Sequence, residues 1–315
     1  MTLKEIANFI GINCQEEIEI IGLNTLLNSN ENELTFLENK KYINDLKNTK
    51  AAAVLVTPEN ASEVPSSTIA LICDEPYLGL AKISKLFAPN VFEVDGNEPI
   101  IGQNTKIMPN VYVGKNSTIG TDCTIMAGAF IGDNVKIGNN TIIYPNVTIY
   151  RDCEIGSDCI IHAGTVIGSD GFGFANTKDG KYIKIYQNGN VKIGNDVEIG
   201  SNCAIDRAVF KSTIIEDGVR LDNLVHIAHN CKIGRGSILV GQVGLAGSTI
   251  LNAYVVMGGQ SGTAGHLEVA PFTTIAARGG VTKSITEPKK SWAGFPLIEH
   301  RQWLKLQGRI SNLLK

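Results

Sequence analysis

The sequence has few aromatic residues, no CxxC pair, no apolar run of membrane-spanning length and no continuous run of basic residues. Aromatic side chains make up 6% of the 315 residues, as expected where Ile and Val fill a narrow core. The net charge of −3 gives no reason to expect a nucleic acid as a partner. The N-terminal residues lack the apolar stretch of a signal peptide, and no segment is apolar over about 20 residues. We therefore expect a soluble, cytoplasmic protein without stable membrane insertion.

An aliphatic residue occupies every sixth position over a long central stretch. The series begins with Ile101, Ile107, Val113, Ile119, Ile125 and Ile131, and continues with Ile137, Ile143, Ile149, Ile155, Ile161 and Ile167. A helix places apolar residues three or four apart, and a strand places them two apart. A period of six instead predicts short strands joined by tight turns, with one branched side chain of each hexad pointing inward. Glycine follows seven of the twelve, where we expect turn conformations that a β-carbon would strain.

The six-residue pattern is interrupted twice. It stops after Gly168 and resumes at Ile193, and the polar, glycine-rich residues 169–190 are predicted to form a loop that leaves the solenoid. A four-residue insertion around 208–212 follows, and the pattern then continues to Val281. If three hexads form one triangular coil, the sequence predicts roughly nine coils stacked about 4.8 Å apart.

The seven cysteines are read as packing residues. Five of them occupy one position of the hexad that elsewhere holds Thr, Val or Ser; they are Cys123, Cys153, Cys159, Cys203 and Cys231. Small side chains at this position suit the interior of the solenoid. Thiolate chemistry is therefore not expected, and a mechanism through a covalent intermediate on Cys231 is the less favoured alternative.

Outside the solenoid the pattern differs. Residues 1–97 are expected to form a small α/β domain. Its helices are predicted at 3–9, 40–47 and 77–87, and its strands at 17–21, 34–37, 51–56 and 68–73. The solenoid then covers 98–285, and 286–315 form a C-terminal extension with a helix over 297–314. From Lys283 to Lys315 there are seven basic residues against two Glu, which makes this end a candidate surface for an acidic partner.

The histidines are the first candidates for chemistry. His162 and His300 are each isolated, and a lone histidine in a solenoid is more often a surface or packing residue. His226 and His229 lie in a segment where the glycine of the hexad is replaced and polar groups crowd together. His266 follows His229 by 37 residues, two coils of 18 plus one, so both should lie on one face about 10 Å apart along the axis. Imidazole titrates near neutral pH, so His229 can accept a proton from an attacking nucleophile.

Four blocks of sequence carry a more specific signal. They are Phe36-Leu37-Glu38-Asn39-Lys40-Lys41-Tyr42, Asp170-Gly171-Phe172-Gly173-Phe174-Ala175, Asp222-Asn223-Leu224 with Ile227-Ala228-His229-Asn230, and Gly265-His266. In these blocks and in their order the chain resembles the UDP-3-O-acylglucosamine N-acyltransferases, with Ile-Ala-His-Asn as the most specific match. One departure is His226, where family members often carry Gln.

The resemblance implies a fold, an activity and partners. The fold would be a left-handed parallel β-helix, the assembly a homotrimer, and the site a groove between neighbouring subunits. The reaction would move a 3-hydroxyacyl chain from acyl carrier protein to the 2-amino group of UDP-3-O-acylglucosamine in lipid A biosynthesis. The chemistry needs neither a cofactor nor a metal.

Individual roles follow from the same resemblance. Phe36 and Tyr42 would sandwich the uracil, and Asn39 with His266 would bind the diphosphate; alternatively, the two rings pack only within the small domain. His229 would be the general base, with Asp222 or Asn223 orienting its ring. A backbone N–H can stabilise the oxyanion of a tetrahedral intermediate, and Gly247 in Leu245-Ala246-Gly247-Ser248 is the candidate donor.

Two other functions stay open at this stage. A related sugar-nucleotide acyltransferase could use the same solenoid with a different amino or hydroxyl acceptor. A zinc-dependent hydratase would need three convergent histidines around an open metal position, and His226, His229 and His266 supply that number.

Overall fold

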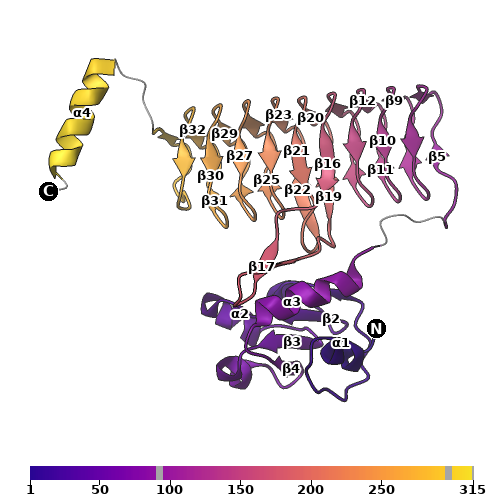
Figure 1. Ribbon diagram of the computed structural model, residues 1–315. Helices are drawn as coiled ribbons and strands as arrows, with labels where there is room; N and C mark the ends of the chain where they lie inside the picture. The colour runs from indigo at the N-terminus through magenta and orange to yellow at the C-terminus, as the bar shows by residue number, and fades with distance from the viewer. Residues whose placement is uncertain (90–94, 295–299, 314–315) are drawn as a thin grey trace.

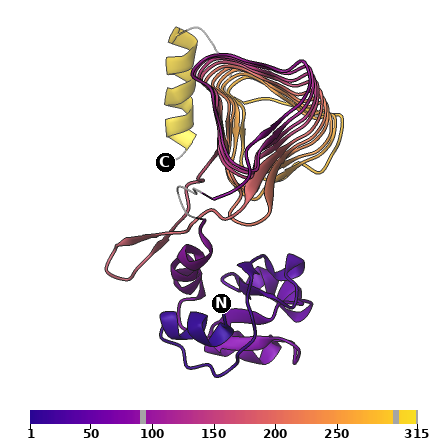
Figure 2. The ribbon, with the colours of Figure 1, turned by 90° about the vertical axis from the view of Figure 1, so that its right-hand side faces the viewer.

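A computed structural model describes residues 1–89, 95–294 and 300–313 of the chain. A triangular prism of three parallel sheets dominates the molecule, and a small α/β domain lies below it (Figures 1 and 2). The chain is mainly β, and the prism is a left-handed parallel β-helix. We number the faces of the prism sheets 1, 2 and 3.

Each sheet consists of short strands from successive coils. Sheet 1 comprises β7 (Tyr112–Val113), β10 (Phe130–Ile131), β13 (Thr148–Ile149), β16 (Val166–Ser169), β21 (Ala204–Asp206), β24 (His226–Ile227), β27 (Gly244–Leu245), β30 (Gly262–Thr263) and β33 (Gly280–Val281). Sheet 2 comprises β5 (Ile100–Ile101), β8 (Thr118–Ile119), β11 (Lys136–Ile137), β14 (Glu154–Ile155), β19 (Asn190–Ile193), β22 (Ser212–Ile215), β25 (Lys232–Ile233), β28 (Ile250–Leu251) and β31 (Glu268–Val269). Sheet 3 comprises β6 (Lys106–Ile107), β9 (Thr124–Ile125), β12 (Ile142–Ile143), β15 (Ile160–Ile161), β20 (Glu198–Ile199), β23 (Arg220–Leu221), β26 (Ile238–Leu239), β29 (Val256–Met257), β32 (Thr274–Ile275) and β34 (Ser291–Trp292).

The pairing register confirms the coil of three hexads. Ile131 pairs with Ile149 and Ile149 with Ile167, so equivalent residues are 18 apart. The inward residue of each hexad is buried along most of the prism; Ile143 and Ile227, for example, are completely inaccessible to solvent. The five solenoid cysteines lie in the same interior, as the sequence predicted, and all are free thiols.

The glycines of the hexad have another role than the one expected. Just over half of the non-glycine residues with positive φ are Asn or Asp, such as Asn134 at 58° and Asp152 at 66°, whose short polar side chains tolerate this conformation. The glycine after the inward residue is needed for close stacking instead. A Cβ on Gly138 would lie 2.6 Å from the carbonyl carbon of Gly156 on the next coil.

The N-terminal domain contains a parallel four-stranded sheet in the order β1-β2-β3-β4. Its elements are α1 (Leu3–Phe9), β1 (Gly22–Leu23), η1 (Leu26–Asn28), β2 (Glu33–Phe36), η2 (Lys40–Tyr42), α2 (Ile43–Lys47), β3 (Ala53–Val56), η3 (Pro58–Glu63), β4 (Ile69–Ile72), α3 (Pro76–Ser84) and η4 (Lys85–Phe87). The predicted strand at 17–21 is wrong. Carbonyls of Glu16 and Ile18 instead accept hydrogen bonds from the start of α1, at Lys4 and Leu3.

Residues 169–190 leave the prism, as expected, but they contain an antiparallel hairpin of β17 (Phe174–Asn176) and β18 (Tyr182–Lys184). The hairpin reaches the N-terminal domain near α3 (Figure 1). Ala175 and Ile185 pack there with Ala81 of α3. The Tyr186 N–H also donates to the Ser84 hydroxyl at 2.9 Å. This excursion therefore links the two domains.

The C-terminal helix α4 (His300–Leu313) stands away from the prism in Figure 1. The first three residues of the predicted helix, 297–299, and its last, 314, lie outside the described residues. No helix in the described ranges is both long and apolar enough to cross a membrane.

Candidate active site

The interruptions of the solenoid and the candidate histidines meet at one corner of the prism. The hairpin excursion and the 208–212 insertion both lie between a strand of sheet 1 and the following strand of sheet 2. His229, Gly247 and His266 occupy the same corner on the next coils, because each follows a sheet 1 strand by one to three residues. We call this edge the 1–2 corner.

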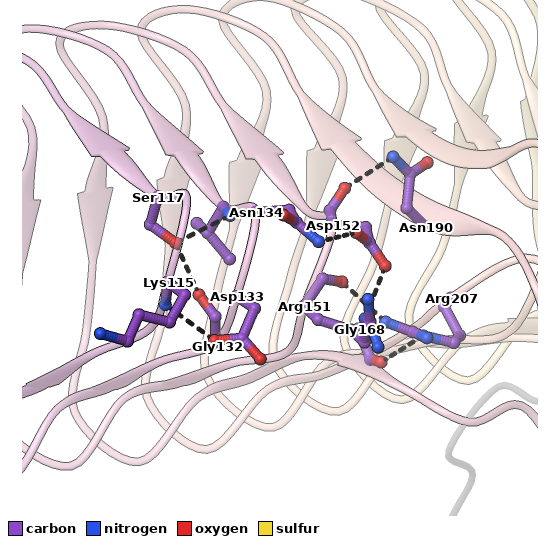
Figure 3. A network of polar contacts seen from close by, with 11 residues as sticks. Lys115, Ser117, Gly132, Asp133, Asn134, Arg151, Asp152, Gly168, Asn190 and Arg207 are labelled. Atoms are coloured by element: carbon purple, nitrogen blue, oxygen red, sulfur yellow. Dashed lines mark hydrogen bonds and ion pairs between the residues drawn. The ribbon is translucent and has the colours of Figure 1, made fainter. Parts of the chain in front are cut away.

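Polar contacts tie both interruptions to the prism (Figure 3). The buried Arg207 donates from Nε to the Gly168 carbonyl and from Nη2 to the Arg151 carbonyl, each at 2.8 Å. The Asn190 amide donates to the Asp152 carbonyl at 2.7 Å. These bonds give the carbonyls of residues 151, 152 and 168 a donor, so the roots of both excursions are fixed.

Asn230 orients the ring of His229. Nδ1 of His229 lies 3.1 Å from Oδ1 of Asn230, which also accepts from the Val209 N–H at 3.0 Å. The Asn230 amide nitrogen donates to the Phe210 carbonyl at 3.0 Å, so this network identifies which end of the side chain is the oxygen. Nδ1 of His229 must therefore carry the proton, and Nε2 of the neutral ring is an acceptor.

Gly247 lies directly against the His229 ring. A Cβ at this position would be 2.7 Å from both Cε1 and Nε2 of His229. The Gly247 carbonyl accepts from the His266 N–H at 3.0 Å, whereas its own N–H has no acceptor within the described ranges. A residue whose backbone N–H lacks an acceptor in the described ranges therefore lies against the edge of the ring that carries the unprotonated nitrogen.

His266 lies one coil beyond Gly247, at the rim of the site. Partial burial lowers the pKa of its imidazole, and the positive charge of Lys41 and the proximity of His229 lower it further. All three effects favour the neutral form of the His266 ring. Lys41 comes from the N-terminal domain, so groups from both domains act on this ring.

A cavity of about 660 Å³ opens between the two domains beside these residues. Its wall includes His229 and His266 from the prism, Phe36 and Tyr77 from the N-terminal domain, and Phe172 from the excursion. Gly171 fits closely there, because a Cβ on it would lie 2.7 Å from Cβ of His229. The cavity thus has an apolar wall with a few polar groups, as small-molecule sites commonly do.

The other residues of the predicted nucleotide site lie in the turn after β2. Oδ1 of Asn39 accepts from the Lys41 N–H at 3.0 Å and caps η2. The Tyr42 ring is 38% exposed, and the Lys41 ammonium lies 4.6 Å from its centroid. Phe36 packs against Tyr77 with ring centroids 6.0 Å apart, so the ring nearest to Phe36 is not Tyr42.

The expected partners of His229 are elsewhere. Asp222 and Asn223 lie at the corner between sheets 3 and 1, on the other side of strand β24. Asp222 accepts from the Gly241 N–H at 2.9 Å, and Asn223 accepts from the Ser201 N–H at 2.7 Å. Within one subunit, therefore, neither of them orients His229, because both side chains brace turns of neighbouring coils.

The buried carboxylate of Asp206 lies near His226. Oδ2 of Asp206 is 3.9 Å from Nε2 of His226, and the Ser169 hydroxyl donates to Oδ1 at 3.1 Å. Burial raises the pKa of Asp206, while His226, the Ser169 hydroxyl and His229 oppose that rise. Asp206 thus places negative potential near His229, which favours a positive charge on its ring during a reaction.

The remaining alternatives for chemistry find little support in the geometry. Burial raises the pKa of Cys231 to about 12, so this thiol is not a nucleophile at neutral pH. Its Sγ donates to the Ala246 carbonyl at 3.3 Å in the interior. Across the described residues, no group of three or more His, Cys, Asp or Glu side chains could hold a metal ion.

Sequence reasoning missed several residues of the wall. Tyr77, Phe210, Asn230 and Ser248 all line the cavity, and none was assigned a role there. Asn230 could have been found, because it adjoins His229 in the Ile-Ala-His-Asn block. No local signal marks Tyr77 or Phe210, since each reaches the cavity only through packing between the domains.

Comparison with known proteins shows which families the chain is similar to. The family model described as UDP-3-O-(3-hydroxymyristoyl) glucosamine N-acyltransferase matches residues 17–86. Models of hexapeptide-repeat transferases match 98–133, 134–169 and 212–247, and a model of the succinyl-transferase hexapeptide repeat matches 190–227.

Relatives match over the whole chain. UDP-3-O-acylglucosamine N-acyltransferase 1 of Sulfurimonas denitrificans is 54% identical over 316 residues, which cover 100% of this chain and 99% of that protein. The UDP-3-O-acylglucosamine N-acyltransferase of Wolinella succinogenes is 50% identical, with 100% and 99% covered. Among solved structures, a UDP-N-acetylglucosamine acyltransferase of Francisella novicida aligns with a TM-score of 0.47 at 25% identity, over 66% of this chain and 74% of that one.

Proposed function

This chain belongs to the family of UDP-3-O-acylglucosamine N-acyltransferases of lipid A biosynthesis, and on that basis we propose that the cavity at the 1–2 corner is its acyl-transfer site. The acceptor is the 2-amino group of the sugar, and the donor is a 3-hydroxyacyl thioester on acyl carrier protein. One observation carries the assignment: Asn230 holds His229 with Nε2 unprotonated, and Gly247 lies directly against that edge of the ring.

Direct attack of the amine on the thioester needs no covalent enzyme intermediate. The amine nitrogen forms a bond to the thioester carbon and gives up a proton to Nε2 of His229. The carbonyl oxygen becomes an oxyanion, which accepts a hydrogen bond from the Gly247 N–H. The C–S bond then breaks, and the proton on the imidazolium passes to the departing thiolate. Asp206 stabilises the imidazolium while it exists.

The nucleotide part of the substrate binds across the two domains. Phe36 and Tyr42 hold the uracil, and stacking on an aromatic ring contributes about 1–3 kcal/mol per base. Asn39 and His266 bind the diphosphate. The Asn39 Nδ2 is suited to this because capping of η2 engages only its Oδ1.

Assembly as a homotrimer would complete the site, with a neighbouring subunit covering the 1–2 corner. Helix α4 would supply a basic surface for the acidic carrier protein. Arg301, Lys305 and Arg309 are spaced four apart on this exposed helix, so they share one face.

An acyl-transfer assay tests the substrate assignment. The purified protein is given 3-hydroxyacyl carrier protein with UDP-3-O-acylglucosamine, UDP-N-acetylglucosamine or UDP-glucosamine without an O-acyl chain. We expect N-acylation of the first acceptor with a kcat/KM well above that for the others. Faster transfer to a hydroxyl of UDP-N-acetylglucosamine would instead identify a related acyltransferase with a different acceptor.

A further inference from the structure

Lys41 is a cation without a carboxylate partner at the edge of the active site. No Asp or Glu in the described ranges lies within 4.0 Å of its ammonium group, whereas neighbouring Lys40 pairs with Glu59 at 3.0 Å. The backbone of Lys41 is held by the Asn39 cap, with an N–H to Oδ1 distance of 3.0 Å. Its side chain is exposed and reaches over the Tyr42 ring, 4.6 Å from the centroid.

The position of Lys41 conflicts with a stacked base. One face of the Tyr42 ring is covered by the ammonium group, and a uracil that stacks on that face must displace it. An exposed cation–π contact is weak, and a charge-assisted hydrogen bond to a phosphate oxygen is stronger. A ligand with both a base and a phosphate can therefore displace the Lys41 ammonium from the Tyr42 ring and bind it through a phosphate oxygen.

The charge of Lys41 also acts on His266 of the prism. After burial, it is the next largest cause that lowers the pKa of this imidazole, so the ammonium group lies within electrostatic range of the ring. Two basic groups from different domains then flank the region beside Asn39. A diphosphate bound between them would neutralise the Lys41 charge locally.

We propose that Lys41 binds the diphosphate of the UDP-sugar and that its ammonium group moves off the Tyr42 ring when the uracil stacks there. This deepens the proposed function, on which it rests, by adding a residue that positions the nucleotide. When the substrate binds, Lys41 thus exchanges its contact with the Tyr42 ring for a contact with the diphosphate.

A proton is taken up in the same step. In the free enzyme the titratable groups that act on His266 are Lys41 and, from two coils earlier, His229, which in turn lies within the electrostatic range of Asp206. Diphosphate removes the effect of Lys41 and adds negative charge, so the pKa of His266 rises and the ring becomes an imidazolium. Nucleotide binding should consequently consume protons near neutral pH.

Binding of UDP and of uridine separates this role from a structural one. Titration calorimetry compares the wild type with Lys41→Met, the rescue variant Lys41→Arg and the matched control Lys40→Met. For Lys41→Met we expect UDP to bind about 10–100-fold more weakly, while uridine binds at least as well as before. Lys41→Arg should recover most of the UDP affinity, and Lys40→Met should resemble the wild type.

A second readout uses the free protein. The His266 imidazole is titrated by NMR, and its pKa should rise in Lys41→Met because a nearby positive charge is removed, but not in Lys40→Met. Calorimetry in buffers of different ionisation enthalpy should show proton uptake on UDP binding that decreases in Lys41→Met. Unchanged UDP affinity and an unchanged His266 pKa in Lys41→Met would overturn the inference. Failure of the wild type to bind UDP at all would contradict the proposed function instead.

Discussion

At the scale of single residues, the hydrogen bond between Asn230 and His229 determines which ring nitrogen can act as a base. Replacing Asn230 with Ala removes this acceptor and leaves the Val209 N–H and the Phe210 carbonyl without their partner. We expect kcat to fall about tenfold or more, with little change in KM, because the ring loses its tautomer and orientation. Steady-state kinetics on the folded variant measures this, and an unaltered kcat would show that Asn230 only braces the 208–212 insertion.

The close contact between Gly247 and His229 gives a second test at this scale. A methyl group on Gly247 would overlap the imidazole ring, with distances of 2.7 Å to Cε1 and Nε2. Gly247→Ala should therefore lower kcat while the prism stays folded. Gly244→Ala on the same coil is the control for thermal stability, since a Cβ there meets nothing within 4 Å. Equal kcat in Gly247→Ala and wild type would remove Gly247 from the site.

The sequence could indicate which histidines meet, but not how each is held. The spacing of 37 residues placed His229 and His266 on one edge because an 18-residue coil converts sequence distance into position. The same arithmetic does not show which way a turn residue points. Asp222 and Asn223 were therefore expected beside His229, although one strand separates their corner from the 1–2 corner. Asn230 acts through a side-chain network that only the three-dimensional structure shows.

At the scale of elements, the hairpin excursion could be located from the sequence but not described. The break in the hexad marked where residues 169–190 leave the prism. The pairing of β17 with β18 and the packing of Ile185 on α3 depend on the N-terminal domain, which lies about 100 residues away in sequence. Long-range packing of this kind has no periodic signal.

Helix α4 carries the prediction that belongs to this scale. Charge reversal at Arg301, Lys305 and Arg309 should raise the KM for acyl carrier protein substrates and reduce the salt dependence of the reaction, since exposed charges act mainly on encounter. The KM for the UDP-sugar serves as the internal control and should stay constant. An unchanged KM for the acyl donor would indicate that α4 packs between subunits instead, which its exposed Leu306 and Ile310 would also permit.

At the scale of the whole molecule, the prism is a regular stack of coils, and the N-terminal domain packs near one of its corners. The period of six specified this stack almost completely, because each hexad repeats the same inward residue and the same turn. The cavity arises where that regularity fails: the hairpin, the 208–212 insertion and the N-terminal domain all meet the prism at the 1–2 corner. The proposed active site thus lies where the chain departs from the hexapeptide repeat.

The most direct test of the account compares His229→Ala with the wild type in transfer from 3-hydroxyacyl carrier protein to UDP-3-O-acylglucosamine. As the general base, His229 acts in the transition state, so kcat should fall by roughly 10²–10⁴ while UDP binding is retained. The variant should stay folded, because the buried residue of that hexad is Ile227. A His229→Ala enzyme that folds, binds UDP and keeps a near-normal kcat would contradict the mechanism.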